Sequence, residues 1–174
     1  MHPLFFLMCF AISFEELPVG WVAIKASNLG YHVSMPKPDR KAFQLFGPDD
    51  KPVHVSQYQG ISDKVTYTVT VTEFSKTYIT QPAGIIFDCT RKEMLTRSKG
   101  RLEYEKDIVF DAVAGREVLI KNADESYLMY RVYVYNLQRY LVMVTIPSKS
   151  ALENKEVQYF YKSFRLIPLK RTIK

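Results

Sequence analysis

The sequence has few of the residues that build disulfide frameworks or metal centres. Its 174 residues include two cysteines, Cys9 and Cys89, and a single tryptophan. Two cysteines are too few for a disulfide framework, and no Cys-x-x-Cys or His-Glu-x-x-His spacing occurs. No apolar run reaches the roughly 20 residues that a membrane-spanning helix requires. The sequence therefore predicts no metal site and no cofactor.

The composition is that of a globular domain, with 47% hydrophobic and 24% charged residues. The length suits one domain, and the 12 tyrosines and 11 phenylalanines favour β structure. A formal net charge of +6 is compatible with nucleic acid, an anionic membrane surface or an acidic protein as partner. The cations are scattered along the chain rather than gathered in a run, which favours an ordinary basic surface.

The N-terminus carries an apolar run from Leu4 to Ile12, which is too short to span a bilayer but has the length of a signal-peptide core. We predict that residues 1–13 are a signal peptide and that residues 14–174 form a single monomeric domain, secreted or periplasmic and without a transmembrane helix. Only His2 precedes the run, and the basic residues usual in that region are missing. An incorrectly assigned start or a buried first strand remain the alternatives.

Alternating apolar and polar residues predict a sheet. The expected strands cover residues 21–25, 31–35, 53–58, 65–72, 102–110, 116–121, 127–135 and 139–146. Short links between most of them demand antiparallel neighbours. Residues 37–51 and 59–63 are interpreted as surface loops, and these loops are candidate places for binding.

Two segments change to a helical period. Residues 82–98 predict a helix with Pro82 in its first turn. Ser150 and Glu153 have the spacing of a capping box, after which an apolar stripe is expected to lie on the sheet; it consists of Val157, Phe160, Tyr161 and Phe164. The fold class predicted is α+β, with a central twisted antiparallel sheet of about six to eight strands and two main helices.

Short motifs in the chain resemble one known group of proteins. They are Tyr31–Pro36, Gly115–Val118, Tyr130–Tyr133, Arg139-Tyr140 and Phe160-x-x-Ser163-Phe164. Together they resemble the PsbP-like group of small exported domains, whose fold is shared with the Ran-binding protein Mog, and the similarity spans most of residues 20–167. The resemblance implies an α/β/α sandwich, and it implies a role in binding or assembling other proteins. No residues that bind metal or photosystem partners are carried over.

Candidate catalytic residues are weak. Cys89 lies four positions after Ile85, which predicts a buried structural thiol on the apolar face of a helix. His32 and His54 lie on predicted strands, and neither has an orienting carboxylate or a nucleophile within reach in the sequence. Both are interpreted as surface or hydrogen-bonded histidines.

Acidic residues alternate along one predicted strand, where Glu103, Glu105 and Asp107 are expected to share a face. Three acids in line could hold a cation or perform acid–base chemistry. Arg101 and Lys106 lie beside them, which favours an exposed strand face with cross-strand ion pairs.

The richest pattern is a stripe on the strand at 127–135. Its members are Tyr127, Met129, Arg131, Tyr133 and Tyr135. Aromatic rings interleaved with arginine could stack nucleic-acid bases, could pack beneath a covering helix, or could form a protein interface, where these residue types are enriched. We take these five residues as the candidate interaction surface.

These observations favour a non-enzymatic binding or assembly domain of the bacterial cell envelope, with a protein or envelope component as partner. The alternative is a small hydrolase or transferase with an unrecognised site. A basic nucleic-acid-binding domain is a further alternative.

Overall fold

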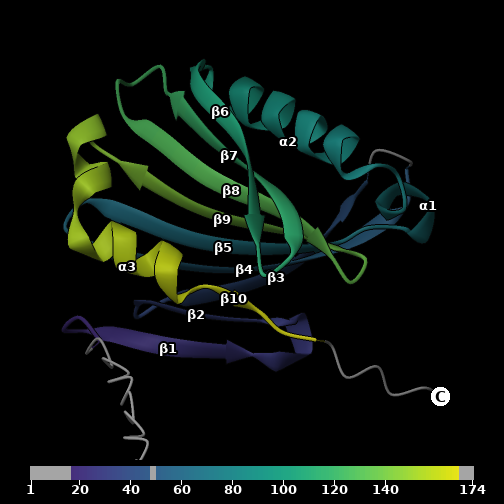
Figure 1. Ribbon diagram of the computed structural model, residues 1–174, viewed down its shortest axis with the longest axis horizontal. Helices are drawn as coiled ribbons and strands as arrows, with labels where there is room; N and C mark the ends of the chain where they lie inside the picture. Colours follow the sequence, from purple (N-terminus) through teal and green to yellow (C-terminus); the bar gives the residue numbers. More distant parts are fainter. Residues whose placement is uncertain (1–16, 48–49, 169–174) are drawn as a thin grey trace, which may run out of the picture.

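A seven-stranded antiparallel sheet forms the centre of the computed structural model, which describes residues 17–47 and 50–168. The strand order is β3-β4-β5-β9-β8-β7-β6 (Figure 1). The strands span Asp39–Phe46 (β3), Pro52–Ser62 (β4), Val65–Glu73 (β5), Arg101–Phe110 (β6), Val113–Lys121 (β7), Tyr127–Tyr135 (β8) and Gln138–Ile146 (β9). The predicted α+β fold and its central antiparallel sheet are confirmed.

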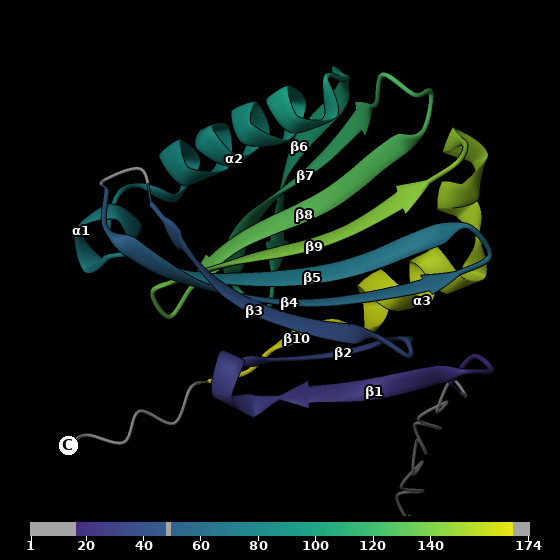
Figure 2. The same ribbon diagram turned by 180° about the vertical axis from the view of Figure 1, so that it is seen from behind.

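Further elements cover the two faces of this sheet. Helices α1 (Lys76–Ile79) and α2 (Ala83–Ser98) lie on one face (Figures 1 and 2). On the other lie α3 (Lys155–Ser163) and a three-stranded sheet of β1 (Trp21–Ala26), β2 (Tyr31–Pro36) and β10 (Arg165–Leu166). The small sheet approaches the large one closely, because a Cβ added to Gly60 of β4 would lie 2.3 Å from the Pro36 carbonyl oxygen.

Strand alternation decides which side chains meet each layer. On β5, the predicted apolar face is buried toward α3; it consists of Val65, Tyr67, Val69 and Val71. The stripe predicted on the last helix is also buried and packs against this face; its members are Val157, Phe160, Tyr161 and Phe164. The largest core therefore lies between the central sheet and the layer formed by α3 and the small sheet.

The loop predicted over residues 37–51 is wrong, because β3 pairs with β4 over its whole length. All eight residues of β3 are exposed, so the strand has no buried face that would impose a strict alternation of apolar and polar residues on its sequence. The loop predicted at 59–63 is also wrong. β4 continues to Ser62, and a two-residue turn of Asp63 and Lys64, both with positive φ, connects it to β5.

The helix predicted at 82–98 is confirmed, with Pro82 at its N-cap rather than inside its first turn. The predicted capping box at Ser150 and Glu153 is wrong. Residues Lys149–Glu153 form a 3-10 helix, and α3 begins only at Lys155. Its N-cap is Asn154, whose side-chain oxygen accepts a hydrogen bond of 2.9 Å from the Glu156 amide.

Replacing Asn154 with alanine is expected to lower the free energy of unfolding by about 1 kcal/mol, since it leaves an amide of the first turn of α3 without its partner. Ser150→Ala is the matched control and should change stability by less than about 0.5 kcal/mol. Urea denaturation followed by circular dichroism measures both. A larger loss for Ser150→Ala than for Asn154→Ala would restore the capping box.

Candidate binding groove

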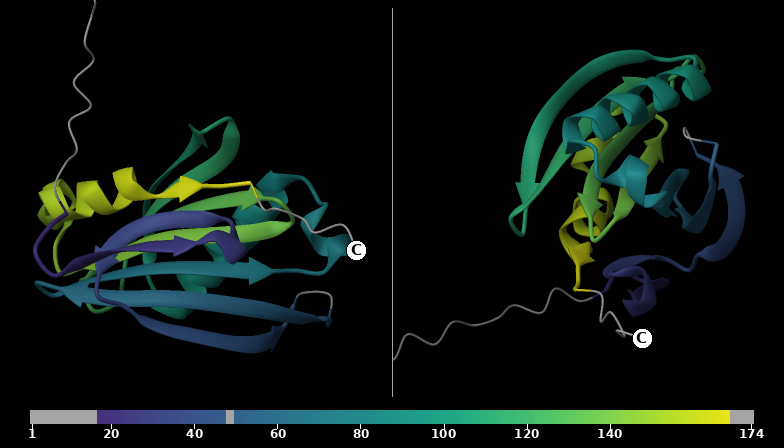
Figure 3. Two further views of the ribbon diagram at one scale, coloured as in Figure 1. Left: turned by 90° about the horizontal axis from the view of Figure 1, so that it is seen from below. Right: turned by 90° about the vertical axis from the view of Figure 1, so that its right-hand side faces the viewer.

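Helix α2 covers only part of its face of the sheet. Its most extensive contacts with the sheet are with β7 and β8. There Phe87 and Met94 pack against a second apolar cluster, formed by Val118, Ile120, Tyr130, Val132 and Leu141. The β3–β4 hairpin lies apart from α2 across the remaining strands (Figure 3). Along β9, β5, β4 and β3, this face of the sheet is therefore less covered than the face beneath α3.

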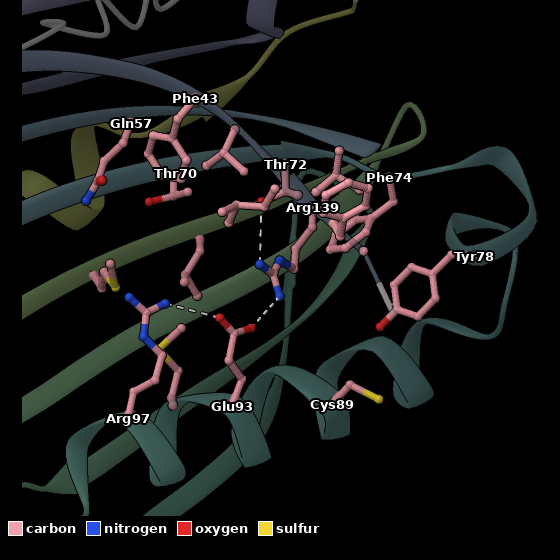
Figure 4. A pocket seen from close by; sticks show the side chains of 18 residues that line it. Phe43, Gln57, Thr70, Thr72, Phe74, Tyr78, Cys89, Glu93, Arg97 and Arg139 are labelled. Atoms are coloured by element: carbon pink, nitrogen blue, oxygen red, sulfur yellow. Dashed lines mark hydrogen bonds and ion pairs between the residues drawn. The ribbon is translucent and has the colours of Figure 1, made fainter. Parts of the chain in front are cut away.

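A groove with a volume of about 490 Å³ lies between α2 and these strands (Figure 4). Its apolar lining consists of Phe43, Leu45, Phe46, Val53, Val55, Phe74, Met94, Leu141 and Met143. Its polar lining includes Gln57, Thr70, Thr72, Tyr78, Cys89, Glu93, Arg97 and Arg139. A second hollow of about 460 Å³ shares Gln57, Met94, Arg97 and Met143 with the first. The groove thus continues along α2 toward the far end of the strands.

The register of the strands places the lining on one face. Phe43 is opposite Val55, and Leu45 is opposite Val53. On the neighbouring pair of strands, Thr72 is opposite Arg139 and Thr70 is opposite Leu141. Because residues two apart on a strand share a face, β3, β4, β5 and β9 all direct alternate side chains into the groove.

An ion-pair network anchors α2 to the floor of the groove. Arg139 donates from Nη1 to Glu93 Oε2 and to Thr90 Oγ1, both at 3.1 Å. Arg97 donates to the other oxygen of Glu93 at 3.2 Å. The Arg139 side chain is 11% exposed and its guanidinium lies 5.0 Å from the centre of the Phe74 ring. One carboxylate between two arginines leaves one excess positive charge among the described residues of the lining.

Cys89 is exposed at the groove, so the prediction that it is a buried structural thiol is wrong. Helix α2 buries Ile86, Phe87, Thr90 and Met94 instead. The helical period is correct, but several faces of α2 carry apolar residues, and packing against the sheet buries only one of them.

Burial, together with the neighbouring Cys89, raises the pKa of Tyr78 to about 12, so its hydroxyl stays protonated at neutral pH.

The five residues of the predicted interaction surface, Tyr127, Met129, Arg131, Tyr133 and Tyr135, do share one face of β8, but it faces α3. Met129 and Tyr133 are buried, at 6% and 2% exposure, and are not accessible to a partner. Arg131 is held by Glu117 at 2.7 Å and lies 4.5 Å from the centre of the Tyr161 ring. Of the three interpretations of this stripe, packing beneath a covering helix accounts for its buried members.

Two of the three acidic residues share a partner, since Glu105 and Asp107 both pair with Arg116, whereas Glu103 lies apart. A β-bulge between Leu102 and Tyr104 interrupts the register of β6. Glu103 pairs with Arg101 and Lys149, whereas Glu105 pairs with Arg91 of α2. Asp107 pairs with Arg116 across the strands, as predicted. Within the described residues, no group of three His, Cys, Asp or Glu side chains could hold a metal ion.

The predicted histidines lie apart. His54 is exposed on β4 of the large sheet, and His32 is half-buried on β2 of the small sheet. Neither lines the groove. Among the groove residues that sequence reasoning missed are Phe43 and Leu45 on β3. Their alternation mirrors that of Val53 and Val55 across a Gly-Pro-Asp-Asp turn, which is the signal of a hairpin.

Comparison with known proteins identifies a fold. Neither protein-family models nor curated proteins match the sequence. The solution structure of cyanobacterial PsbP (CyanoP) from Synechocystis sp. PCC 6803 matches with a TM-score of 0.56 and 10% identity, over 84% of this chain and 92% of that chain. A Pseudomonas aeruginosa protein of unknown function matches with a TM-score of 0.40 and 12% identity, over 85% and 96% of the two chains.

The predicted resemblance is therefore confirmed at the level of fold. In residues 17–47 and 50–168, no helix combines the length and apolar character needed to cross a bilayer. The signal peptide predicted at 1–13 lies outside the described residues. With its central antiparallel sheet between helical layers, the chain has the fold of the PsbP-like proteins.

Proposed function

We propose that this chain is a non-enzymatic binding domain that holds an apolar segment of a partner protein in the groove between α2 and β3. The observation that carries the proposal is the apolar wall formed by β3 at the groove. There Phe43 and Leu45 are 42% and 52% exposed on the strand that borders the hollow. Concave apolar surfaces with a few polar groups are typical binding sites.

The chemistry of the lining supports binding rather than catalysis. Among the described residues that line the groove there is no histidine, and the one carboxylate, that of Glu93, is occupied by two arginines. Phenylalanine, methionine, tyrosine and arginine, which are enriched at the centres of protein interfaces, all occur in it. We further propose that the domain acts after export, at the bacterial cell envelope, because the apolar run at Leu4–Ile12 suits a signal peptide.

Site-specific photocrosslinking in the native cell tests the groove. A photoreactive phenylalanine analogue at position 43 or 45 is expected to crosslink one discrete partner. The same analogue at Val109, which is 76% exposed on the opposite edge strand β6, is the matched control and should not. Equal crosslinking from positions 43 and 109, or none from positions 43 and 45, would contradict the proposal. Intact mass of the native protein tests the export step, with loss of residues 1–13 as the expected result.

A further inference from the structure

The two edges of the central sheet are protected to different degrees. The edges of sheets are commonly protected by charges, prolines or bulges, because an unpaired edge strand is a template for pairing with another strand. The edge strand β6 has a bulge and carries charged residues from Arg101 to Asp107. The edge strand β3 has its charges only at Asp39–Lys41. Residues 42–46, Ala-Phe-Gln-Leu-Phe, contain no charge, proline or glycine and pair with β4 without a register shift.

This unprotected half of β3 is also the half that borders the groove. Phe43 and Leu45 lie on the groove face of the sheet, opposite Val55 and Val53. Phe46, at the end of the strand, is 80% exposed. A strand added outside β3 would extend this face and direct alternate side chains toward the groove. Helix-shaped ligands would use the apolar lining too, but they would leave the outward amides and carbonyls of β3 unpaired.

Charge on β3 indicates what such a strand would contain. Lys41 lies on the groove face, opposite Gln57, and forms no ion pair with any residue that the structure describes. Oppositely charged residues facing each other across antiparallel strands stabilise the pairing. An acidic side chain opposite Lys41 would therefore favour the added strand, and apolar side chains would suit the positions beside Phe43 and Leu45.

A second copy of the chain fits this edge poorly. In an antiparallel pair of two β3 strands, Asp39 meets Lys41 only in the register that also places Arg40 opposite Arg40. In that register the uncharged half, Ala42–Phe46, extends past the partner strand. Registers that pair the uncharged halves leave Lys41 opposite an apolar residue or Gln44. Like charges directly opposite destabilise a pair, so the edge favours a different chain.

We propose that β3 receives an extended segment of a partner protein as an eighth strand of the sheet. The segment carries apolar residues at alternate positions, facing the groove, and an acidic residue opposite Lys41. This inference rests on the proposed function, because it names how the partner segment is held. Main-chain hydrogen bonds supply the affinity, and the alternate side chains supply the specificity.

The test uses eight-residue peptides selected from a displayed library on the intact domain, retaining those that fail to bind Leu45→Asp. The selected peptides are expected to alternate apolar residues and to carry an acid at one end. Each is then resynthesised with N-methyl groups on its odd or on its even amides. Because successive amides of a strand point in opposite directions, one methylated version should lose at least tenfold in affinity while the other binds as before.

The charge is tested by Lys41→Glu, which should weaken the selected peptides several-fold and favour versions in which lysine replaces the acid. If both methylated versions bind equally, or if the apolar residues recur at helical spacing, strand addition is wrong while the groove remains the binding site. If the library yields no peptide that binds the intact domain and fails to bind Leu45→Asp, strand addition is wrong, and if photocrosslinking from positions 43 and 45 also yields no partner, both proposals fail.

Discussion

Truncating Phe164 to alanine is expected to lower the free energy of unfolding by about 3–5 kcal/mol, the range for removing a buried phenylalanine ring. Phe164 follows α3 directly and is 2% exposed. Its ring stacks on Tyr133 of β8 at a centroid distance of 5.8 Å and on Tyr31 of β2 at 5.9 Å. The ring therefore joins the small sheet, the last helix and the central sheet, and its loss leaves a cavity where the three meet.

Urea denaturation monitored by tyrosine fluorescence measures this effect. Phe46→Ala is the matched control, since Phe46 is 80% exposed at the end of β3, and its unfolding free energy should change by less than about 0.5 kcal/mol. A loss of under 1 kcal/mol for Phe164→Ala would show that the small sheet and α3 are held to the central sheet by other contacts.

The elements with a strong period were predictable from sequence. Val65, Tyr67, Val69 and Val71 alternate because the face of β5 toward α3 packs in the apolar core while the other face carries threonines, and the short links between later strands force antiparallel neighbours. The apolar stripe of α3 was likewise visible because only one side of that helix meets the sheet. In both elements the local pattern and the tertiary environment agree.

The candidate site was predictable only in part, because the bending of the sheet and the register of its strands bring together residues from separate elements. Phe43, Cys89 and Arg139 lie far apart in the sequence and meet only where the β3–β4 hairpin faces α2. Residues 37–51 are a predicted place for binding, but the prediction gives them as a loop, whereas they include the strand β3. The apolar alternation of β3 is limited to Phe43 and Leu45, because the strand is exposed on both faces, and it is therefore a much weaker signal than that of β5.

The stripe on β8 shows a different limit. Its alternation correctly placed Met129, Arg131 and Tyr133 on one face. The sequence of β8 does not show which of its faces a helix covers, since both faces carry tyrosines and apolar residues. The chain covers the face with the arginine and leaves part of the opposite side of the sheet open. Binding is therefore expected on the α2 side, and Arg131 is expected to matter for stability.

Replacing Arg131 with methionine should accordingly lower the free energy of unfolding by about 2–4 kcal/mol at pH 7, since removing one partner of a buried ion pair leaves the other charge poorly compensated. That other charge is Glu117, whose side chain is 4% exposed. Lys106 at 2.8 Å and the Tyr104 hydroxyl at 2.9 Å also bind this carboxylate. Because they remain, the expected loss is below the full effect of an unpaired buried charge.

The pH dependence identifies the cause. Burial alone would raise the pKa of Glu117, but hydrogen bonds from Lys106 and Arg131 outweigh it and lower the pKa below its ordinary value of 4.5. A carboxyl whose pKa is lower in the folded state stabilises the protein above its unfolded pKa, and this contribution is lost as the pH falls through the folded value. The stability difference between wild type and Arg131→Met should therefore shrink below about pH 4.5.

Arg97→Met is the matched control for this substitution. Its side chain is 72% exposed and pairs with Glu93 on the surface of α2, and exposed pairs of this kind contribute about 0–1 kcal/mol. Denaturation curves at pH 7 and pH 3 measure both variants. If Arg131→Met is no less stable than Arg97→Met at pH 7, Lys106 and the hydrogen bond from the Tyr104 hydroxyl compensate the Glu117 carboxylate without Arg131. Arg131 would then be free to act in recognition at the α3 face, and the assignment of binding to the α2 face would lose its support from β8.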